Sequence, residues 1–128
     1  MLRRFAAATA TASAVLAIAS LVVRALPVPL ERFTPLLALW CLAPAVWGLW
    51  AMLAPGNWVP GRLPQWGSLL GVLAGILAML VLDLPARVRG LPVPLPYRVG
   101  GAALLAVFYY FLWMLVARAY RALAPGPA

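Results

Sequence analysis

The sequence predicts an all-α integral membrane protein, a four-helix bundle built from two tandem helical hairpins in a parallel repeat. Hydrophobic residues make up 66% of the 128-residue chain and charged residues only 9%, whereas soluble domains carry roughly 25% charge. Four apolar runs each come near the ~20 residues that a helix needs to cross a bilayer. In addition, one seven-residue segment recurs about half a chain later.

The four apolar runs should each form one span of a single transmembrane domain over residues 1–128. The expected spans are Phe5–Val23, Phe33–Ala54, Trp66–Leu84 and Val99–Ala117. An arginine at the bilayer centre costs about 2.5–3.5 kcal/mol, and every arginine of the chain lies outside these runs. The connecting segments are rich in proline and too short for a folded domain: 24–32, 55–65 and 85–98.

The first run has a second interpretation, as a cleavable signal peptide. Arg3 and Arg4 precede an alanine-rich stretch that contains the triplet Ala10-Thr11-Ala12, which is typical of a cleavage site. The run is long for the apolar core of a signal peptide. We therefore expect it to be retained as a span.

The recurring segment lies between the two helices of each expected hairpin. Arg24–Leu30 reads RALPVPL and Arg89–Leu95 reads RGLPVPL, so six of seven positions agree at an offset of 65 residues. We interpret this as a duplicated hairpin with repeats 1–64 and 66–128; chance similarity in a Leu- and Pro-rich chain is the alternative. A two-span repeat returns to its starting side, so both copies should lie at one membrane face, in extended polyproline-II geometry.

Small residues recur at helical spacing in two of the runs. Gly67, Gly71 and Gly75 form one stripe on the third run, and Ala10 and Ala14 have the same spacing on the first. Such stripes allow helix backbones to approach closely in lipid. We expect these faces to pack together, with the first and third helices at the centre of the bundle. Docking of another subunit on the glycine stripe is the alternative.

Aromatic residues of the second and fourth runs could surround a bound lipid, quinone or carotenoid, and no other cofactor is expected. The candidates for this site are Trp40, Trp47, Trp50, Tyr109, Tyr110 and Trp113. Ordinary packing against neighbouring helices is the alternative, with the phenol hydroxyls bonded to backbone carbonyls.

The basic residues are ten arginines, divided equally between the two expected membrane faces. The face that holds both termini has Arg3, Arg4, Arg62, Arg118 and Arg121. The other face has the candidates for contacts with anionic lipid: Arg24, Arg32, Arg87, Arg89 and Arg98. The terminal amine favours cytoplasmic termini in a bacterial inner membrane, and dual topology is the alternative. Because the arginines are spread over short segments, we expect no binding of nucleic acid.

Asp83 is the only acidic residue within the expected spans, next to the end of the third. Acids inside a membrane are candidates for ion or proton relays. The alternative is an ion pair with Arg87, four residues further on, if the helix continues past Pro85.

The residue inventory argues against catalysis and against a metal site. The chain has no His, no Lys and one Cys, so imidazole ligands, Schiff-base chemistry and an intrachain disulfide are all excluded. We expect a non-catalytic accessory, assembly or scaffold subunit that contacts the bilayer and other membrane subunits. One alternative is a lipid-, pigment- or quinone-binding subunit. Another is a small homo-oligomeric transporter or channel. Its path would be lined by Thr9, Thr11, Ser13, Ser20, Ser68, Tyr109, Tyr110 and Asp83.

Overall fold

The computed structural model describes residues 2–59 and 61–123, and these residues form helices and connecting turns without any strand. The long helices are α1 (Leu2–Ala25), α2 (Thr34–Leu53), α3 (Leu63–Gly75) with its π-helical continuation η3 (Ile76–Val81), and α5 (Leu95–Ala122). The short elements are the 3-10 helices η1 (Leu30–Phe33) and η2 (Gly56–Trp58), and the α-helix α4 (Leu84–Arg89).

Four helical segments of this described part are long and apolar enough to cross a membrane. They are Leu2–Ala25, Glu31–Leu53, Leu63–Val81 and Leu95–Ala122. Each overlaps one expected span, so the prediction of an all-helical chain with four long apolar helices is confirmed. The third helix ends three residues before its expected limit, and the fourth begins four residues earlier than expected.

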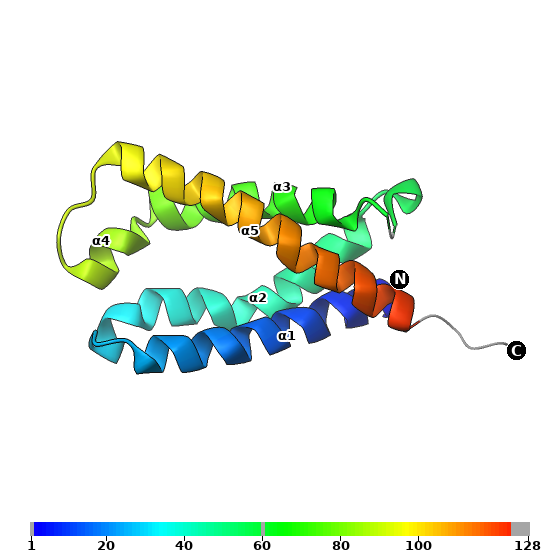
Figure 1. The fold of residues 1–128 in the computed structure, drawn as a ribbon, viewed down its shortest axis with the longest axis horizontal. Helices are drawn as coiled ribbons and strands as arrows, with labels where there is room; N and C mark the ends of the chain where they lie inside the picture. The colour runs from blue at the N-terminus through cyan, green and yellow to red at the C-terminus, as the bar shows by residue number, and fades with distance from the viewer. Residues whose placement is uncertain (1, 60, 124–128) are drawn as a thin grey trace, which may run out of the picture.

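The four long helices pack as two antiparallel pairs (Figure 1). α1 lies along α2, α3 lies along α5, and α5 also crosses to contact α1 near the termini. At the opposite end, where α1 leads to α2 and α4 leads to α5, the two pairs diverge. The expectation that the first and third helices are central is therefore wrong, because α5 is the helix that joins the pairs.

Small residues set the close contact between α3 and α5, as the glycine stripe predicts. A Cβ added at Gly71 would lie 2.6 Å from the Tyr109 Cβ, and one at Gly75 would lie 2.9 Å from the carbonyl oxygen of Ala102. At Gly67 an added Cβ would overlap the Trp113 ring. All three glycines are buried. The stripe thus packs inside the chain, against α5 rather than against α1.

The small residues of α1 that pack inside the chain are not the expected ones. Ala10 and Ala14 are exposed, whereas Ala7, Ala8 and Ala12 are buried in the core. Alanines occupy every side of this helix, so spacing alone leaves its rotation undetermined. The rotation is instead fixed by larger groups, because the Phe5 and Thr9 side chains fill the space beside Gly48 of α2.

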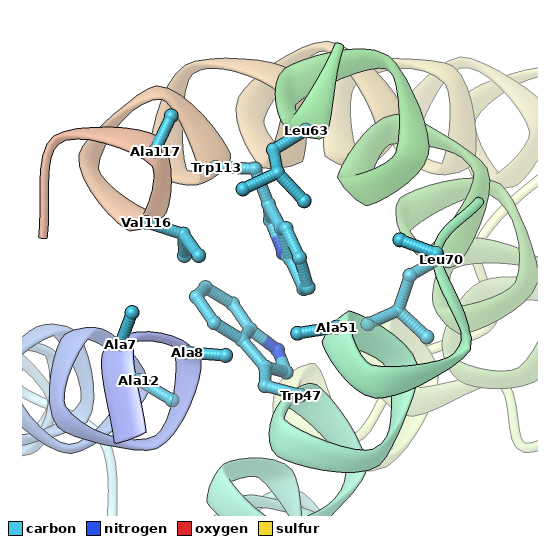
Figure 2. Packing of buried hydrophobic residues seen from close by; sticks show 11 residues of the cluster. Ala7, Ala8, Ala12, Trp47, Ala51, Leu63, Leu70, Trp113, Val116 and Ala117 are labelled. Carbon is cyan, nitrogen blue, oxygen red and sulfur yellow. The ribbon is translucent and has the colours of Figure 1, made fainter. Parts of the chain in front are cut away.

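Two tryptophans form the centre of the core (Figure 2). Trp47 of α2 and Trp113 of α5 have ring centroids 5.5 Å apart, and Trp47 meets Tyr109 edge to face at 5.3 Å. Residues from all four long helices surround them: Ala7, Ala8, Ala12, Ala51, Leu63, Leu70, Val116 and Ala117. The aromatic pair therefore joins the two helix pairs at the depth where α5 crosses.

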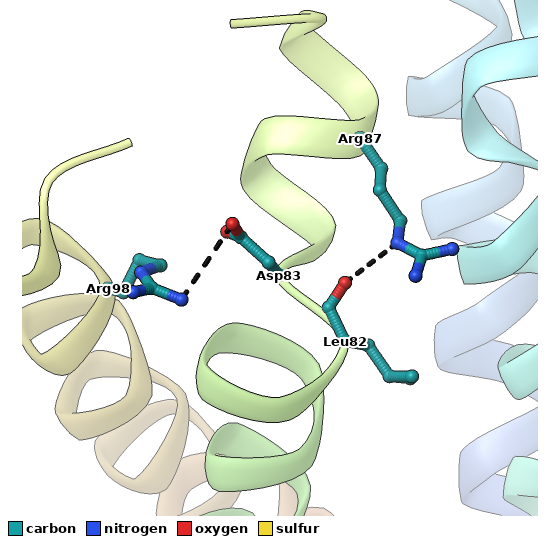
Figure 3. A network of polar contacts seen from close by, with 4 residues as sticks. All are labelled: Leu82, Asp83, Arg87 and Arg98. Atoms are coloured by element: carbon teal, nitrogen blue, oxygen red, sulfur yellow. Dashed lines mark hydrogen bonds and ion pairs between the residues drawn. The ribbon is translucent and has the colours of Figure 1, made fainter. Parts of the chain in front are cut away.

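The third helix does not run on to Arg87, so the expected ion pair between Asp83 and Arg87 is absent. The backbone N–H of Leu82 donates to the carbonyl of Leu77 at 2.9 Å, a π-type bond, and Asp83 then takes a left-handed conformation with φ of 49°. Pro85 lies in the first turn of the separate helix α4. Because the chain turns at Asp83, its carboxylate faces α5 and lies 3.7 Å from Arg98 Nη1 (Figure 3).

Candidate functional site

An apolar groove lies between the two helix pairs, on the side where they diverge. Its volume is about 600 Å³, and carbon atoms form nearly all of its lining. It extends from Trp47 and Tyr109 in the middle of the bundle to Leu84, Pro85 and Val88 of α4 at the loop end. Side chains from all four long helices line it, among them Leu16, Leu39, Leu70 and Leu105.

Three of the six aromatic candidates line this groove. They are Trp40, Trp47 and Tyr109. Trp113 is fully buried in the core instead, and its indole N–H has no acceptor among the described residues. Tyr110 is on the outer surface of α5 beside Phe111, with ring centroids 5.8 Å apart.

Trp50, the sixth candidate, serves to join α2 to α3. Its indole stacks on that of Trp66 with centroids 4.6 Å apart and an interplanar angle of 15°. The Trp50 N–H donates to the carbonyl of Trp66 at 2.7 Å, and the Trp66 N–H donates to the carbonyl of Trp50 at 2.6 Å. Both indole donors are thus satisfied, and neither ring takes part in the groove.

The five arginines of the loop end differ in their contacts. Arg98 faces Asp83, which balances its charge. Arg32 donates through Nη1 to the carbonyl of Arg89 at 3.0 Å, at the C-terminal end of α4, so η1 and α4 are held together. Arg87 donates through Nε to the carbonyl of Leu82 at 2.8 Å. The fifth arginine is Arg24, which is exposed at the end of α1.

Three of the eight polar side chains expected to line an ion path bond to helix carbonyls. Thr11 donates to the carbonyl of Ala7 at 2.8 Å, Ser68 to that of Ala106 at 3.1 Å, and Thr9 to that of Pro44 at 3.5 Å. Asp83 lies at the end of η3, beside Arg98. Among residues 2–59 and 61–123 there is no group of three or more His, Cys, Asp or Glu side chains that could hold a metal ion.

Sequence reasoning missed α4, the helix that covers the loop end of the groove. The signals for it are present: Asp83 precedes it, Pro85 lies in its first turn, and Gly90 ends it with φ of 74°. Proline near a helix start and glycine just after its end are the usual boundary residues. The helix is only six residues long, too short to show a helical periodicity in the sequence.

Sequence reasoning also missed the polar contacts that close the end with the termini. Arg3 donates through Nε to the carbonyl of Tyr120 at 2.7 Å, and its guanidinium lies 3.6 Å from the centre of the Tyr120 ring. Arg4 donates through Nη1 to the carbonyl of Ala54 at 2.9 Å, just past the end of α2. These cations meet the C-terminal ends of α5 and α2, where the helix dipole favours positive charge.

In comparisons with protein-family models, with curated proteins and with solved structures, nothing matches this chain.

Proposed function

We propose that this chain is a non-catalytic, multi-pass membrane protein that binds the hydrocarbon chain of a lipid or isoprenoid molecule in the groove between its two helix pairs. The observation that carries the proposal is the groove itself, an apolar space of about 600 Å³ that the protein leaves unfilled between α2 and the α3–α5 pair. Sites for small molecules have volumes of roughly 300–1,000 Å³ and are mostly apolar.

The size and chemistry of the groove favour a hydrocarbon chain over other occupants. A spanning helix, roughly 10 Å wide and 30 Å long, would fill on the order of 2,000 Å³, far more than the groove offers. Water is disfavoured because it needs two to four polar partners, and the lining has almost none. Lipid tails surround any membrane-inserted helix and match the lining in polarity.

We further propose that all four long helices span a bacterial inner membrane, with the termini in the cytoplasm. Arg3 and Arg4 lie at the start of the first helix, and positive charge beside the first span favours the cytoplasmic side. The hydrogen bond from Arg32 to the carbonyl of Arg89 supports a common membrane face for the two Leu-Pro-Val-Pro-Leu segments.

We also propose that the chain arose from a duplicated hairpin. Pro29 and Pro94 are equivalent positions of the repeated segment, and their backbone angles agree closely, at −56° and 133° against −59° and 147°. Both pairs are polyproline-II values. The elements that follow differ, since a 3-10 turn precedes α2 whereas α5 begins at once. In this proposal the two halves diverged around a shared turn.

The role as an accessory subunit of a larger complex remains a second candidate, and the outer face of α5 favours it. Tyr110 and Phe111 are exposed there, with their rings in edge-to-face contact. A phenol hydroxyl in hydrocarbon needs an acceptor, which a neighbouring chain could supply to Tyr110. Purification in a mild detergent tests this candidate, because a specific co-purifying membrane protein should be lost in Tyr110→Phe. A monodisperse monomer without such a protein argues against it.

A transporter or channel has less support, because the span hydroxyls of Thr11 and Ser68 are occupied by helix carbonyls. Flux through liposomes that disappears in Asp83→Asn would favour that alternative over the binding role.

Filling the groove tests the proposed function. Ala74 of α3 lines the groove, whereas Val72 on the same helix is exposed. Native mass spectrometry of the detergent-purified protein, after addition of palmitoyl-oleoyl phosphatidylcholine, should detect about one retained lipid for each wild-type chain. Ala74→Phe should lose this lipid, and the control Val72→Phe should keep it. Equal retention by both variants would contradict the proposal.

A further inference from the structure

The groove is bounded at its loop end by a short helix with apolar and basic faces. Leu84, Pro85 and Val88 of α4 line the groove, and Arg87 and Arg89 lie on either side of Val88 in the sequence. Both arginines are exposed. If the tail of a molecule lies along the groove, its polar end would therefore lie beside α4, at the loop end.

A third arginine contacts α4 from the other helix pair. η1 packs against α4, and Arg32 of η1 bonds the carbonyl of Arg89 through one nitrogen only. Arg87 likewise uses only its Nε, and its side chain extends from α4 on the side away from Arg98 (Figure 3). Since a guanidinium has five N–H donors in a planar fork, both arginines retain donors suited to phosphate oxygens.

The nearby acids leave this cluster positively charged. Asp83 faces Arg98, which therefore does not belong to the cluster. Glu31 precedes Arg32 in η1 and is exposed. Three guanidinium groups against one carboxylate leave net positive charge at the end of a groove that is otherwise apolar.

We propose that the groove and the cluster of Arg32, Arg87 and Arg89 form one site for an anionic phospholipid. One acyl chain lies in the groove, and the phosphate group lies at the arginines, beside α4. This inference rests on the proposed function and adds the headgroup to it. A carotenoid or quinone would leave the arginines without a partner, and free phosphate would leave the groove empty.

The test compares two phospholipids with the same tails. Native mass spectrometry would measure retention of palmitoyl-oleoyl phosphatidylglycerol against palmitoyl-oleoyl phosphatidylcholine by the full chain, with the fold checked by near-ultraviolet circular dichroism. We expect wild-type protein to prefer phosphatidylglycerol. The double variant Arg87→Gln/Arg89→Gln should show a preference about 30-fold smaller. Each arginine near an anionic group contributes about 1 kcal/mol, and two of them correspond to about 30-fold in affinity. Its retention of phosphatidylcholine should fall much less, because the choline cation offsets the charge of the phosphate in that lipid.

A matched control is available at the opposite end of the bundle. Arg118 and Arg121 are exposed arginines near the end of α5, far from the groove, so Arg118→Gln/Arg121→Gln should retain the wild-type preference. A second measurement needs no variant, because high salt should weaken retention of the anionic phosphatidylglycerol more than retention of the zwitterionic phosphatidylcholine. Excess inorganic phosphate should not displace the lipid, since it lacks a tail to occupy the groove.

Distinct failures identify which proposal is wrong. Equal retention of both lipids by the wild type would overturn the headgroup inference and leave the binding of a hydrocarbon chain intact. The same loss in the Arg118/Arg121 control would overturn it as well, because the effect would then follow total charge. Retention of neither lipid would overturn the proposed function itself.

Discussion

Gly71 offers the sharpest test of the α3–α5 contact on which the bundle depends. In Gly71→Ala, the new Cβ would lie 2.6 Å from Tyr109 Cβ and 3.0 Å from the Cα of Ala106, whereas ordinary contact begins at 3.4 Å. The Cα of Ala106 belongs to the backbone and the Tyr109 Cβ is fixed to it, so α5 must move away by a substantial part of an ångström. A gap of 0.5–1 Å forfeits about a quarter to a half of the dispersion energy of each contact.

The size of the effect follows from two opposing terms. Overpacking costs about 1–3 kcal/mol, and replacing a helical glycine with alanine returns up to about 1 kcal/mol. We therefore expect Gly71→Ala to lose about 1–2 kcal/mol of unfolding free energy. Gly100 of α5 has nothing within 4 Å of an added Cβ, so Gly100→Ala should instead gain up to about 1 kcal/mol.

Reversible unfolding in mixed micelles with increasing sodium dodecyl sulfate measures these differences. Near-ultraviolet circular dichroism reports on the contact between Trp47 and Trp113. A displacement of α5 would move Trp113 relative to Trp47 and change this signal. Gly67→Ala should be more damaging than Gly71→Ala, because its Cβ would overlap a fully buried indole. If Gly71→Ala were as stable as Gly100→Ala, the glycine stripe would not face α5, and a partner subunit would be the better explanation for it.

Substitutions at two further places, the Trp50–Trp66 pair and Asp83, probe polar contacts in the same unfolding assay. Trp50→Phe and Trp66→Phe each remove one of the two reciprocal indole hydrogen bonds, so each should cost about 1 kcal/mol of unfolding free energy. In the double variant the two losses should not add, because the stacked rings are coupled. Strictly additive losses would mean that the rings act independently. Asp83→Asn should change stability by less than about 1 kcal/mol, since the ion pair with Arg98 is partly exposed. Asp83→Val should cost about 1–2 kcal/mol more, because a branched side chain is disfavoured in the left-handed backbone conformation of this residue. Equal effects would show that the ion pair, and not the backbone conformation, determines the loss.

The four long helices could be predicted because the bilayer acts on each residue separately. A charge inside a span is costly wherever it lies, so the arginines mark the limits of the apolar runs without any knowledge of the fold. The same local logic predicted that Gly67, Gly71 and Gly75 approach another backbone closely. It could not identify that backbone, because the choice of α5 depends on Tyr109 and Trp113, whose side chains fit over the glycines.

The candidate site was only partly predictable, for a geometric reason. Trp40, Trp47 and Tyr109 line the groove, whereas Trp50 and Trp113 make other contacts that depend on helix rotation. The groove itself has no local signal in the sequence, since it arises where two helix pairs diverge. Asp83, Pro85 and Gly90 are boundary residues of a short helix. They can be recognised as such only once the preceding helix is known to end at Val81.

The close packing at the end with the termini and the separation of the helix pairs at the loop end are related. At the end with the termini, Arg3 bonds a carbonyl of α5, and Trp50 and Trp66 join α2 to α3. Ala7 and Ala8 of α1 pack with Val116 and Ala117 of α5 in the core near this end. α5 lies along α3 and crosses to α1 near the termini, so the two pairs meet at that end and diverge at the other (Figure 1). The groove thus lies beside α4 because the opposite end is fixed, and any variant that loosens the Trp50–Trp66 contact should also change the shape of the groove.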